Sequence, residues 1–191
     1  MRKIVIVDYN IDWADEFNVL KAVYLKHMKH LNIDVQHVGS TSVPGLAAKP
    51  ILDIDIIIDN IEKLNSVIVV LEELGYTHQG DLGIKGREAF NRKSDTVPYH
   101  NNQSYRFAHN LYVCAAGSAA LKYHLLFRDY LRQNSEAACE YGNLKKELAA
   151  KYEYDIDSYI ENKTGFITKI LSITGVSESE IIEITMQNRI K

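Results

Sequence analysis

The chain has 191 residues, of which 46% are hydrophobic and 25% are charged, and its formal net charge at pH 7 is −3. This length and composition predict one domain over residues 1–191, and the slightly acidic balance excludes general nucleic-acid binding through a global positive field. No apolar run approaches the roughly 20 residues that a membrane-spanning helix needs.

The first part of the chain alternates strand and helix patterns. The spacing of apolar residues predicts strands over 3–7, 33–38 and 51–59 and helices over 13–31 and 61–74. Asp12 is the expected N-cap of the first helix. Gly75 stands where the C′ residue of the second helix would be.

From residue 76 onward the pattern is first β and then helical. Short strands are predicted over 76–79, 88–92 and 105–114, with a polar loop over 93–103. Helices are predicted from Ser118, from Ser135 and from Asp155 or Asp157, ending near residues 133, 152 and 174, with a last short helix over 177–189. The expected fold is α+β: a mixed β-sheet core over 1–116 with flanking helices, followed by a helical C-terminal part over 117–191.

Two cysteines bear on the location of the protein. Cys114 and Cys139 lack the CxxC spacing of zinc and redox sites. The N-terminal stretch has too short an apolar run for a signal peptide. We therefore expect reduced thiols and a cytoplasmic protein.

The predicted strand over 51–59 carries two acidic residues on one face. Because side chains alternate along a strand, Asp53 and Asp55 project together, opposite a wholly aliphatic face. Two carboxylates about 7 Å apart repel by roughly 2 kcal/mol at an effective dielectric of ~20, and a divalent cation or a basic partner would reverse this. The pair is typical of a Mg²⁺ site; a half-exposed edge strand with a solvated outer face is the alternative.

A Gly-Ser turn precedes that strand. Gly39 permits close backbone approach, and Ser40 and Thr41 add hydroxyl donors, so the turn suits the oxygens of a phosphate. Twelve residues separate Ser40 from Asp53, enough for a return strand that brings both elements to one cleft. An ordinary Ser/Thr-rich turn is the alternative.

The Gly-Ser turn, the spacer and the Asp-Ile-Asp strand together resemble the signature of the DNA polymerase β-like nucleotidyltransferase superfamily. More closely, the stretch HVGSTSVPGLAAKPILDIDI is similar to the GrpB family, whose members are predicted nucleotidyltransferases. The similarity runs along most of the chain, through Trp13 and the segments 83–90, 109–113, 127–131, 144–145 and 163–166.

This resemblance implies a nucleotidyltransferase-like core with its active-site strand at Asp53 and Asp55. Gly39, Ser40 and Thr41 would contact the phosphates of a nucleoside triphosphate, and the two aspartates would hold Mg²⁺ or Mn²⁺. In the two-metal mechanism of the superfamily, one ion activates the attacking hydroxyl and the other stabilises the leaving pyrophosphate. The acceptor of the nucleotidyl group is unknown.

The chain departs from the superfamily pattern in one respect. Active members usually add a third carboxylate from a neighbouring strand, whereas residues 105–114 contain no Asp or Glu. His109 is the expected replacement, either as a ligand of a metal such as Mn²⁺ or as a general base. The alternative is a strand histidine held by hydrogen bonds.

Five basic residues lie in the segments that resemble the family, and they are the expected phosphate-binding cations: Lys49, Arg87, Arg128, Lys145 and Lys163. A nucleoside triphosphate carries about four negative charges, so its site needs several such groups. The alternatives are ion pairs within the chain. Arg87 could pair with Glu88 or Asp81, and Arg128 could pair with Asp129.

The sequence therefore predicts a metal-dependent nucleotidyltransferase that moves a nucleotidyl group from a nucleoside triphosphate to an unknown hydroxyl. Two alternatives stay open. The absent third carboxylate favours a non-catalytic module that binds a nucleotide or another phosphate ligand. A metal-dependent phosphohydrolase would instead place His109 on the metal.

Overall fold

A five-stranded mixed sheet in the order β1-β2-β5-β4-β3 forms the centre of the computed structural model, which describes residues 3–101 and 104–187. β2 and β5 are parallel, and the other neighbouring strands are antiparallel. The strands are β1 (Ile33–Val38), β2 (Ile51–Ile58), β3 (Tyr76–His78), β4 (Arg87–Arg92) and β5 (Ala108–Ala115). The mixed sheet and its helices confirm the predicted α+β class.

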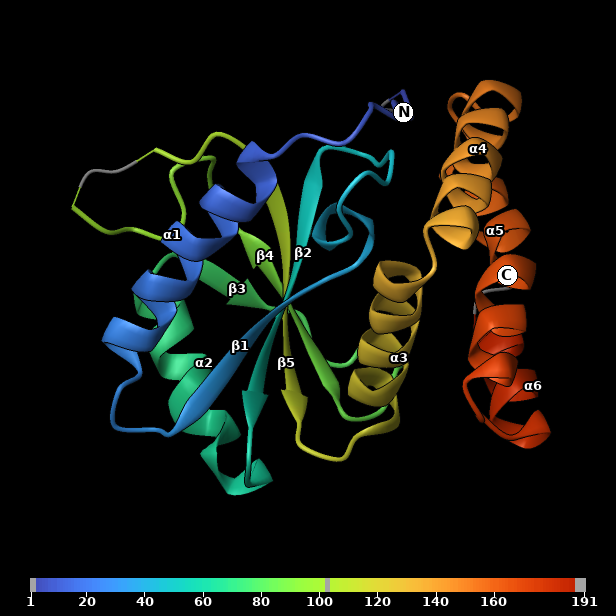
Figure 1. Ribbon diagram of the computed structural model, residues 1–191. Coiled ribbons are helices and arrows are strands. Elements are labelled where there is room, and N and C mark those ends of the chain that lie inside the picture. Colours follow the sequence, from blue (N-terminus) through green and yellow to red (C-terminus); the bar gives the residue numbers. More distant parts are fainter. Residues whose placement is uncertain (1–2, 102–103, 188–191) are drawn as a thin grey trace.

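Helices cover both sides of this sheet. Figure 1 shows α1 and α2 on one side, α3 on the other, and α4 to α6 stacked beyond α3. Short 3₁₀ turns, η1 (Ser40–Ser42) and η2 (Ile61–Lys63), follow β1 and precede α2. The helices are α1 (Asp12–His27), α2 (Leu64–Glu73), α3 (Ala119–Gln133), α4 (Ser135–Lys151), α5 (Ile156–Ile173) and α6 (Glu178–Gln187).

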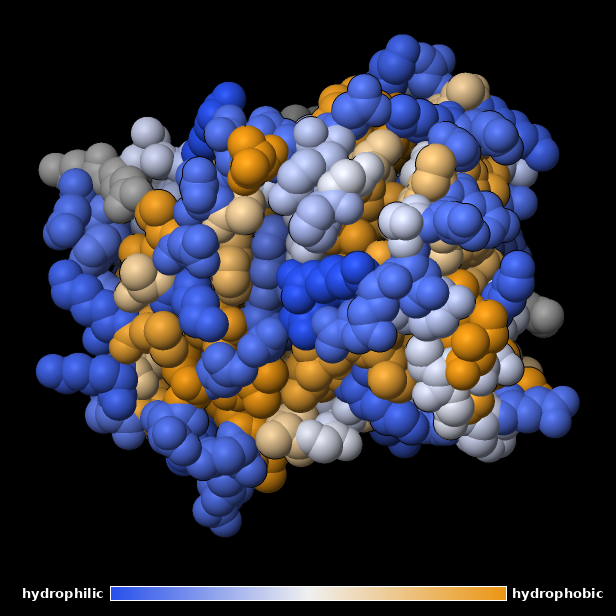
Figure 2. Space-filling view, in the orientation of Figure 1, coloured by the Kyte–Doolittle hydropathy of each residue, from blue (hydrophilic) through white to orange (hydrophobic). Residues whose placement is uncertain are grey.

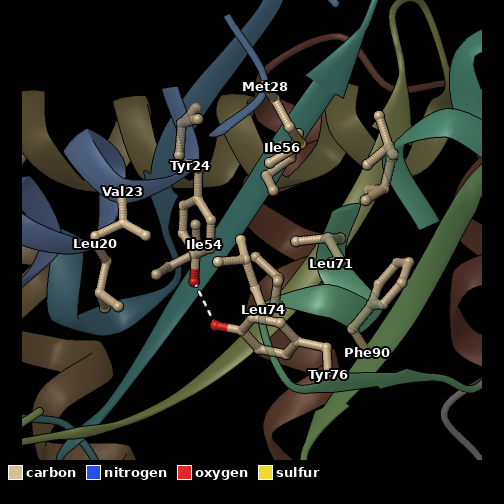
Figure 3. Packing of buried hydrophobic residues seen from close by; sticks show 14 of the residues in the cluster. Leu20, Val23, Tyr24, Met28, Ile54, Ile56, Leu71, Leu74, Tyr76 and Phe90 are labelled. Carbon is tan, nitrogen blue, oxygen red and sulfur yellow. Dashed lines mark hydrogen bonds between the residues drawn. The ribbon is translucent and has the colours of Figure 1, made fainter. Parts of the chain in front are cut away.

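The aliphatic face of β2 lies in the main core. Ile54 and Ile56 are fully buried and belong to one cluster with side chains of α1 and α2, seen in Figure 3. Burying one such side chain contributes about 1.5–3 kcal/mol, so this face fixes which side of β2 turns inward. β2 pairs with β1 and β5, so it is an interior strand, and the edge-strand alternative is wrong.

The N-terminal segment differs from its prediction. Residues 3–7 do not form a strand: Val7 makes an isolated antiparallel bridge with Ala48. The amide of Ile4 donates instead to the carbonyl of Glu153, just after α4. The backbone hydrogen bonds of this segment therefore go to two separate partners outside the sheet.

Several helix ends also differ. Asp12 does not cap α1: its own N–H donates to the side chain of Asn10. α1 ends at His27 rather than near Leu31. Asn134, not Ser135, is the N-cap residue of α4.

Other helix ends agree with the prediction. The side chains of Ser118 and Asp155 accept capping hydrogen bonds at the starts of α3 and α5. Gly75 follows α2 with a φ of +98°, as its predicted C′ role requires. Residues 188 and 189 of the last predicted helix lie outside the described residues.

His109 belongs to the core face of the sheet. It pairs with Leu52 across the parallel β2–β5 ladder, so it shares the aliphatic face of β2. Its Nε2 lies 2.6 Å from the hydroxyl of Tyr76, which in turn lies 2.6 Å from the hydroxyl of Tyr24, the dashed line in Figure 3. The strand histidine held by hydrogen bonds is the alternative that the structure supports.

No helix in the described ranges is long and apolar enough to cross a bilayer. On the face drawn in Figure 2, hydrophobic side chains are interspersed with hydrophilic ones. Scattered exposed apolar residues of this kind are normal on protein surfaces.

Two buried histidines predict loss of stability in acid. Burial, aided by nearby arginines, lowers the pKa of His37 and of His109 to about 3. Between that value and the ordinary value near 6.5, the unfolded chain binds protons that the folded chain excludes. The free energy of unfolding should therefore fall as pH drops from about 6.5 towards 4, each histidine contributing up to about 1.4 kcal/mol per pH unit.

Urea denaturation at several pH values measures this slope. His109→Gln keeps a polar partner for Tyr76 but removes one titrating group. We expect the variant to lose stability less steeply in acid than the wild type. Identical slopes would contradict the assignment of His109 as a neutral core residue.

Candidate functional site

The acid face of β2 is turned towards the C-terminal helices. Asp55 is fully buried, and Asp53 is half-buried. Asn110 and Tyr112 of β5 pair with these two acids across the ladder and therefore share their face. Asn110 donates a side-chain hydrogen bond of 2.8 Å to Asp53 Oδ1. The β5 positions beside the acids thus carry an amide and a phenol where a third carboxylate was looked for.

The Gly-Ser turn lies directly against Asp53. Val38, the last residue of β1, pairs with Asp53, so the chain leaves β1 beside this carboxylate. Gly39 has a φ of +67°, and a Cβ on it would lie 2.2 Å from Asp53 Oδ2. Only glycine therefore fits here, with its backbone packed against the Asp53 carboxylate.

The hydroxyl residues of the turn have different surroundings. Ser40 lines a cavity beside Asp53. Thr41 is buried, and its Oγ1 lies 3.0 Å from His37 Nε2. Thr41 therefore fastens the turn to β1, so its predicted contact with a phosphate has no support in this geometry.

Three lysines surround Asp53 from separate elements. Lys49 precedes β2, Lys145 comes from α4 and Lys163 from α5, and each interacts electrostatically with the Asp53 carboxylate. The ammonium groups lie over aromatic rings: Lys145 is 4.6 Å from the centre of the Tyr141 ring. Lys49 and Lys163 are each 5.4 Å from the centre of the Tyr159 ring. Lys49 and Lys163, more than a hundred residues apart in the sequence, thus lie near the same carboxylate, Asp53.

These lysines outnumber the acid they face. Burial, with repulsion from Lys163, lowers the pKa of Lys145 to about 7. Burial, with repulsion from Lys49, lowers the pKa of Lys163 to about 8. Burial also raises the pKa of Asp53, while Asn110 and the lysines oppose that rise.

Lys145 is the most confined of the three. It is 2% exposed, and its Nζ has no hydrogen-bond partner among the described residues. A buried ammonium without a partner costs free energy. A bound anion would supply both the hydrogen bond and the countercharge, so the cluster has the properties of an anion site.

Asp55 has a partner that sequence reasoning did not select. His124 of α3 places its Nδ1 2.7 Å from Asp55 Oδ2, and its side chain is 29% exposed. The other oxygen, Asp55 Oδ1, is buried and meets no hydrogen-bond donor within the described ranges. The apolar stripe of α3 contains His124, but its spacing alone did not distinguish it from a core residue.

A cavity of about 280 Å³ adjoins these groups. Its polar wall contains Gly39, Ser40, Asp53, Arg87, His124 and Lys163. The Arg87 guanidinium lies 4.4 Å from the centre of the Tyr112 ring. The apolar wall comes from α3, α5 and α6, through Phe127, Ile167, Leu171 and Ile184.

Arg87 does not take either predicted ion-pair partner. Glu88 instead pairs with His78 at 2.7 Å, and Asp81 accepts a hydrogen bond from the Gly83 amide. Arg87 thereby stays directed to the cavity and to Tyr112.

Arg128 lies away from the cavity wall and acts within the fold. Its guanidinium donates to Gln36 Oε1 and to the carbonyl of His37, at 2.8 and 3.1 Å. Its Nε lies 2.7 Å from Asp129. The ion pair with Asp129, the predicted alternative, is what forms, and Arg128 fastens α3 to β1.

His109 is also absent from this site. It faces the α1–α2 core on the opposite side of the sheet from Asp53 and Asp55. The prediction that His109 joins the aspartates on a metal is therefore wrong, because strand alternation directs it to the other face.

Asp53 and Asp55 suit a cation whose remaining ligands are phosphate and water. In the part of the chain that the structure describes, no three His, Cys, Asp or Glu side chains gather closely enough to hold an ion alone. Asp55 Oδ1, however, is a buried oxygen in need of a partner. Mg²⁺ in phosphate-transfer sites is held by one or two carboxylates, with phosphate and water as the other ligands. Asp53 and Asp55 match that pattern.

The fold is that of a nucleotidyltransferase-like protein. The structure aligns with the Cid1 poly(U) polymerase at a TM-score of 0.56, covering 85% of this chain and 50% of that chain at 11% sequence identity. At that identity the likeness concerns the fold alone.

The chain belongs to the GrpB family. The model of the GrpB protein family matches residues 3–172. The crystal structure of the conserved protein GrpB from Enterococcus faecalis aligns with a TM-score of 0.72 and 31% identity, covering 94% of this chain and 98% of that one. The UPF0157 protein YqkA of Bacillus subtilis is 36% identical over 170 residues, which is 87% of this chain and 46% of that protein. This chain thus spans about half the length of the Bacillus protein.

Two glycines test the contact between the turn and Asp53. Gly39 and Gly45 both have positive φ, +67° and +79°, but only at Gly39 would a Cβ strike another atom. Alanine should cost about 1 kcal/mol at Gly45 through backbone strain and about 1–3 kcal/mol more at Gly39 through the clash. Chemical denaturation of both variants measures the difference. Equal losses would show that Gly39 is not pressed against the Asp53 carboxylate.

Proposed function

We propose that this protein is a nucleotidyltransferase. It binds a nucleoside triphosphate together with Mg²⁺ or Mn²⁺ and moves the nucleotidyl group to a hydroxyl acceptor. One observation carries the proposal: the acid face of β2 meets three lysines from separate elements around Asp53. The nucleotidyltransferase-like fold supports the same class.

The charges at the site suit a polyphosphate. Lys49, Lys145 and Lys163 face one carboxylate, Asp53, so the cluster is positive when all four groups are ionised. A triphosphate brings about four negative charges, which several lysines together with a cation neutralise. The unpaired Lys145 Nζ would then gain a phosphate oxygen as its hydrogen-bond partner.

The cavity suits the remainder of the nucleotide. Its polar lining residues include Gly39, Ser40 and Lys163, which would contact phosphate oxygens. Its apolar lining residues include Phe127 of α3 and Ile167 of α5, which suit a nucleobase or sugar. Arg87, held over Tyr112, would contribute a further positive charge in the cavity lining.

Each group of residues at the site has a separate role in the proposed transfer reaction. Asp53 and Asp55 would hold the cation, which when bound supplies Lewis-acid stabilisation at the reacting phosphate. Asn110 fixes the Asp53 carboxylate through its 2.8 Å hydrogen bond. As the acceptor hydroxyl oxygen bonds to the α-phosphorus, its proton passes to solvent. The bond from the α-phosphorus to the oxygen that bridges the α- and β-phosphates breaks, and pyrophosphate leaves. The lysines bear the charge that develops on the leaving group.

A second candidate is a non-catalytic nucleotide-binding module. It is favoured by Asn110 and Tyr112, which stand on β5 beside the two aspartates. Such a module would bind nucleotides in the same cavity without turnover. The phosphohydrolase alternative depended on His109, and that residue faces the other side of the sheet.

The cellular setting is part of the proposal. Cys114 and Cys139 are free thiols, which supports the cytoplasmic location expected from the sequence. Its partners would be a nucleoside triphosphate and a hydroxyl-bearing acceptor.

Neighbouring lysines on α4 provide a matched test of binding. Lys145 is buried in the cluster, whereas Lys146 is exposed and pairs with Asp8. Titration calorimetry with ATP, GTP, CTP and UTP, each with Mg²⁺ or Mn²⁺, should detect binding of at least one of them by the wild type. Lys145→Ala should weaken nucleotide binding about tenfold or more, because it removes one charge-assisted hydrogen bond. Lys146→Ala should leave binding unchanged.

Turnover separates the two candidate functions. Pyrophosphate release would be followed with the bound nucleotide and a mixture of sugar, RNA and peptide hydroxyl acceptors. A transferase releases pyrophosphate and loses this activity in Asp53→Asn. Binding without release in the wild type, and binding that survives Asp53→Asn, would favour the module. No cation-dependent binding of any of the four nucleotides by the wild type would contradict both.

The lowered lysine pKa values predict a pH dependence of polyphosphate binding. The pKa of Lys145 is about 7 and that of Lys163 about 8 in the free protein. A bound polyanion favours the charged ammonium form and raises both. Affinity should therefore fall as pH rises from 7 to 9, and binding near pH 8 should take up protons.

Calorimetry in buffers of different ionisation enthalpy measures that uptake. Lys145→Met removes one titrating group and should flatten the profile, while Lys146→Met should not. Proton release on binding, or an affinity that rises with pH, would contradict the assignment of the lysines to the phosphates.

A further inference from the structure

Among the described residues that line the candidate cavity, His124 is the one that carries an imidazole. It extends from α3, sixty-nine residues along the chain from Asp55, and its Nδ1 lies 2.7 Å from Asp55 Oδ2. Its side chain is 29% exposed, whereas Asp55 is fully buried. The ring therefore lies between the buried acid and the cavity.

We propose that His124 is a ligand of the divalent cation and takes the place of the third carboxylate. This inference rests on the proposed function of the site. It gives α3, rather than the neighbouring strand β5, the third protein group beside Asp53 and Asp55. Among the described residues these three groups do not lie closely enough together to enclose an ion by themselves. A phosphate ligand and a movement of the His124 ring would complete an Asp-Asp-His set in place of three acids.

The geometry suits two ligands of one ion. Metal–ligand bonds to imidazole nitrogen or carboxylate oxygen are about 2.0–2.2 Å long, so two ligands at a right angle lie about 3 Å apart. The separation between His124 Nδ1 and Asp55 Oδ2 is 2.7 Å. A small outward movement of the half-buried ring would admit the ion in place of the hydrogen bond.

The surroundings provide a reason for an imidazole at this position. On β5 the positions beside the acids are Asn110 and Tyr112, and burial, with repulsion from Asp53, raises the pKa of Tyr112 to about 12. Tyr112 is therefore a neutral phenol at physiological pH. Asp55 Oδ1 is left buried without a donor in the described part of the chain, as expected of a group that serves an ion.

The ligand type predicts a metal preference. Imidazole nitrogen suits Mn²⁺ and Zn²⁺ better than Mg²⁺, which prefers oxygen. The wild type should therefore bind Mn²⁺ more tightly than Mg²⁺ in the presence of a polyphosphate. His124→Asp, which restores an oxygen ligand, should shift the preference towards Mg²⁺.

Electron spin-echo spectroscopy of bound Mn²⁺ tests the ligand directly. The full chain would be loaded with Mn²⁺ and inorganic tripolyphosphate, a probe that contains no nitrogen. A histidine-nitrogen coupling is expected, and its pattern should change when histidine is labelled with ¹⁵N. His124→Gln, which keeps an N–H donor for Asp55, should abolish the coupling and weaken Mn²⁺ binding about tenfold or more. His30→Ala, at an exposed position, is the control and should retain both.

The outcomes separate this inference from the proposed function. Bound Mn²⁺ without histidine coupling in the wild type would overturn the role of His124 and leave the carboxylate site standing. It would make His124 a hydrogen-bond partner of Asp55 only. Histidine coupling that persists in His124→Gln would also overturn the proposed role of His124 as a ligand. No Mn²⁺ binding with tripolyphosphate would overturn both the ligand and the proposed cation site.

Discussion

The alternation of side chains along β2 is the constraint on which both the fold and the site depend. Its even-numbered residues, among them Ile54 and Ile56, are fully buried against α1 and α2. Because that face is fixed by the hydrophobic effect, Asp53 and Asp55 must project to the other side. There the Gly39 backbone lies directly against Asp53, which no other residue would allow. The core thus positions the acids, and the acids require the glycine.

The C-terminal helices bring positive charge to this acid face. α4 and α5 bring Lys145 and Lys163 to Asp53, and both lysines have lowered pKa values because they are buried close to other positive charges. An arrangement with more cations than anions is costly when empty and favourable when a polyanion enters. The charge surplus, and not the aspartate pair alone, is what supports the proposal of phosphate binding.

Sequence patterns predicted what depends on local order. Strand alternation identified the face of Asp53 and Asp55, the turn identified Gly39, and the Ser118 and Asp155 caps followed from helix-start rules. Contacts between distant segments were harder to foresee. His109 was assigned to the metal although its strand position directs it into the core.

The two α3 residues that were missed or misassigned share one property. His124 reaches Asp55 across the gap between a helix and the sheet, and Arg128 bonds to β1 rather than to the cavity. Neither partner is set by spacing within an element, because both depend on how α3 packs. Lys145 and Lys163 were assigned to phosphate through family resemblance, and their convergence on Asp53 is a property of the tertiary fold.

The central claim is that the acid face of β2 and the three lysines form one cation–polyphosphate site. Anomalous diffraction from crystals grown with Mn²⁺ and a non-hydrolysable nucleoside triphosphate analogue tests it most directly. The account predicts a manganese peak beside Asp53 and Asp55, with phosphate density extending from it to Lys145 and Lys163. Manganese and phosphate bound elsewhere, with these side chains unchanged, would contradict it.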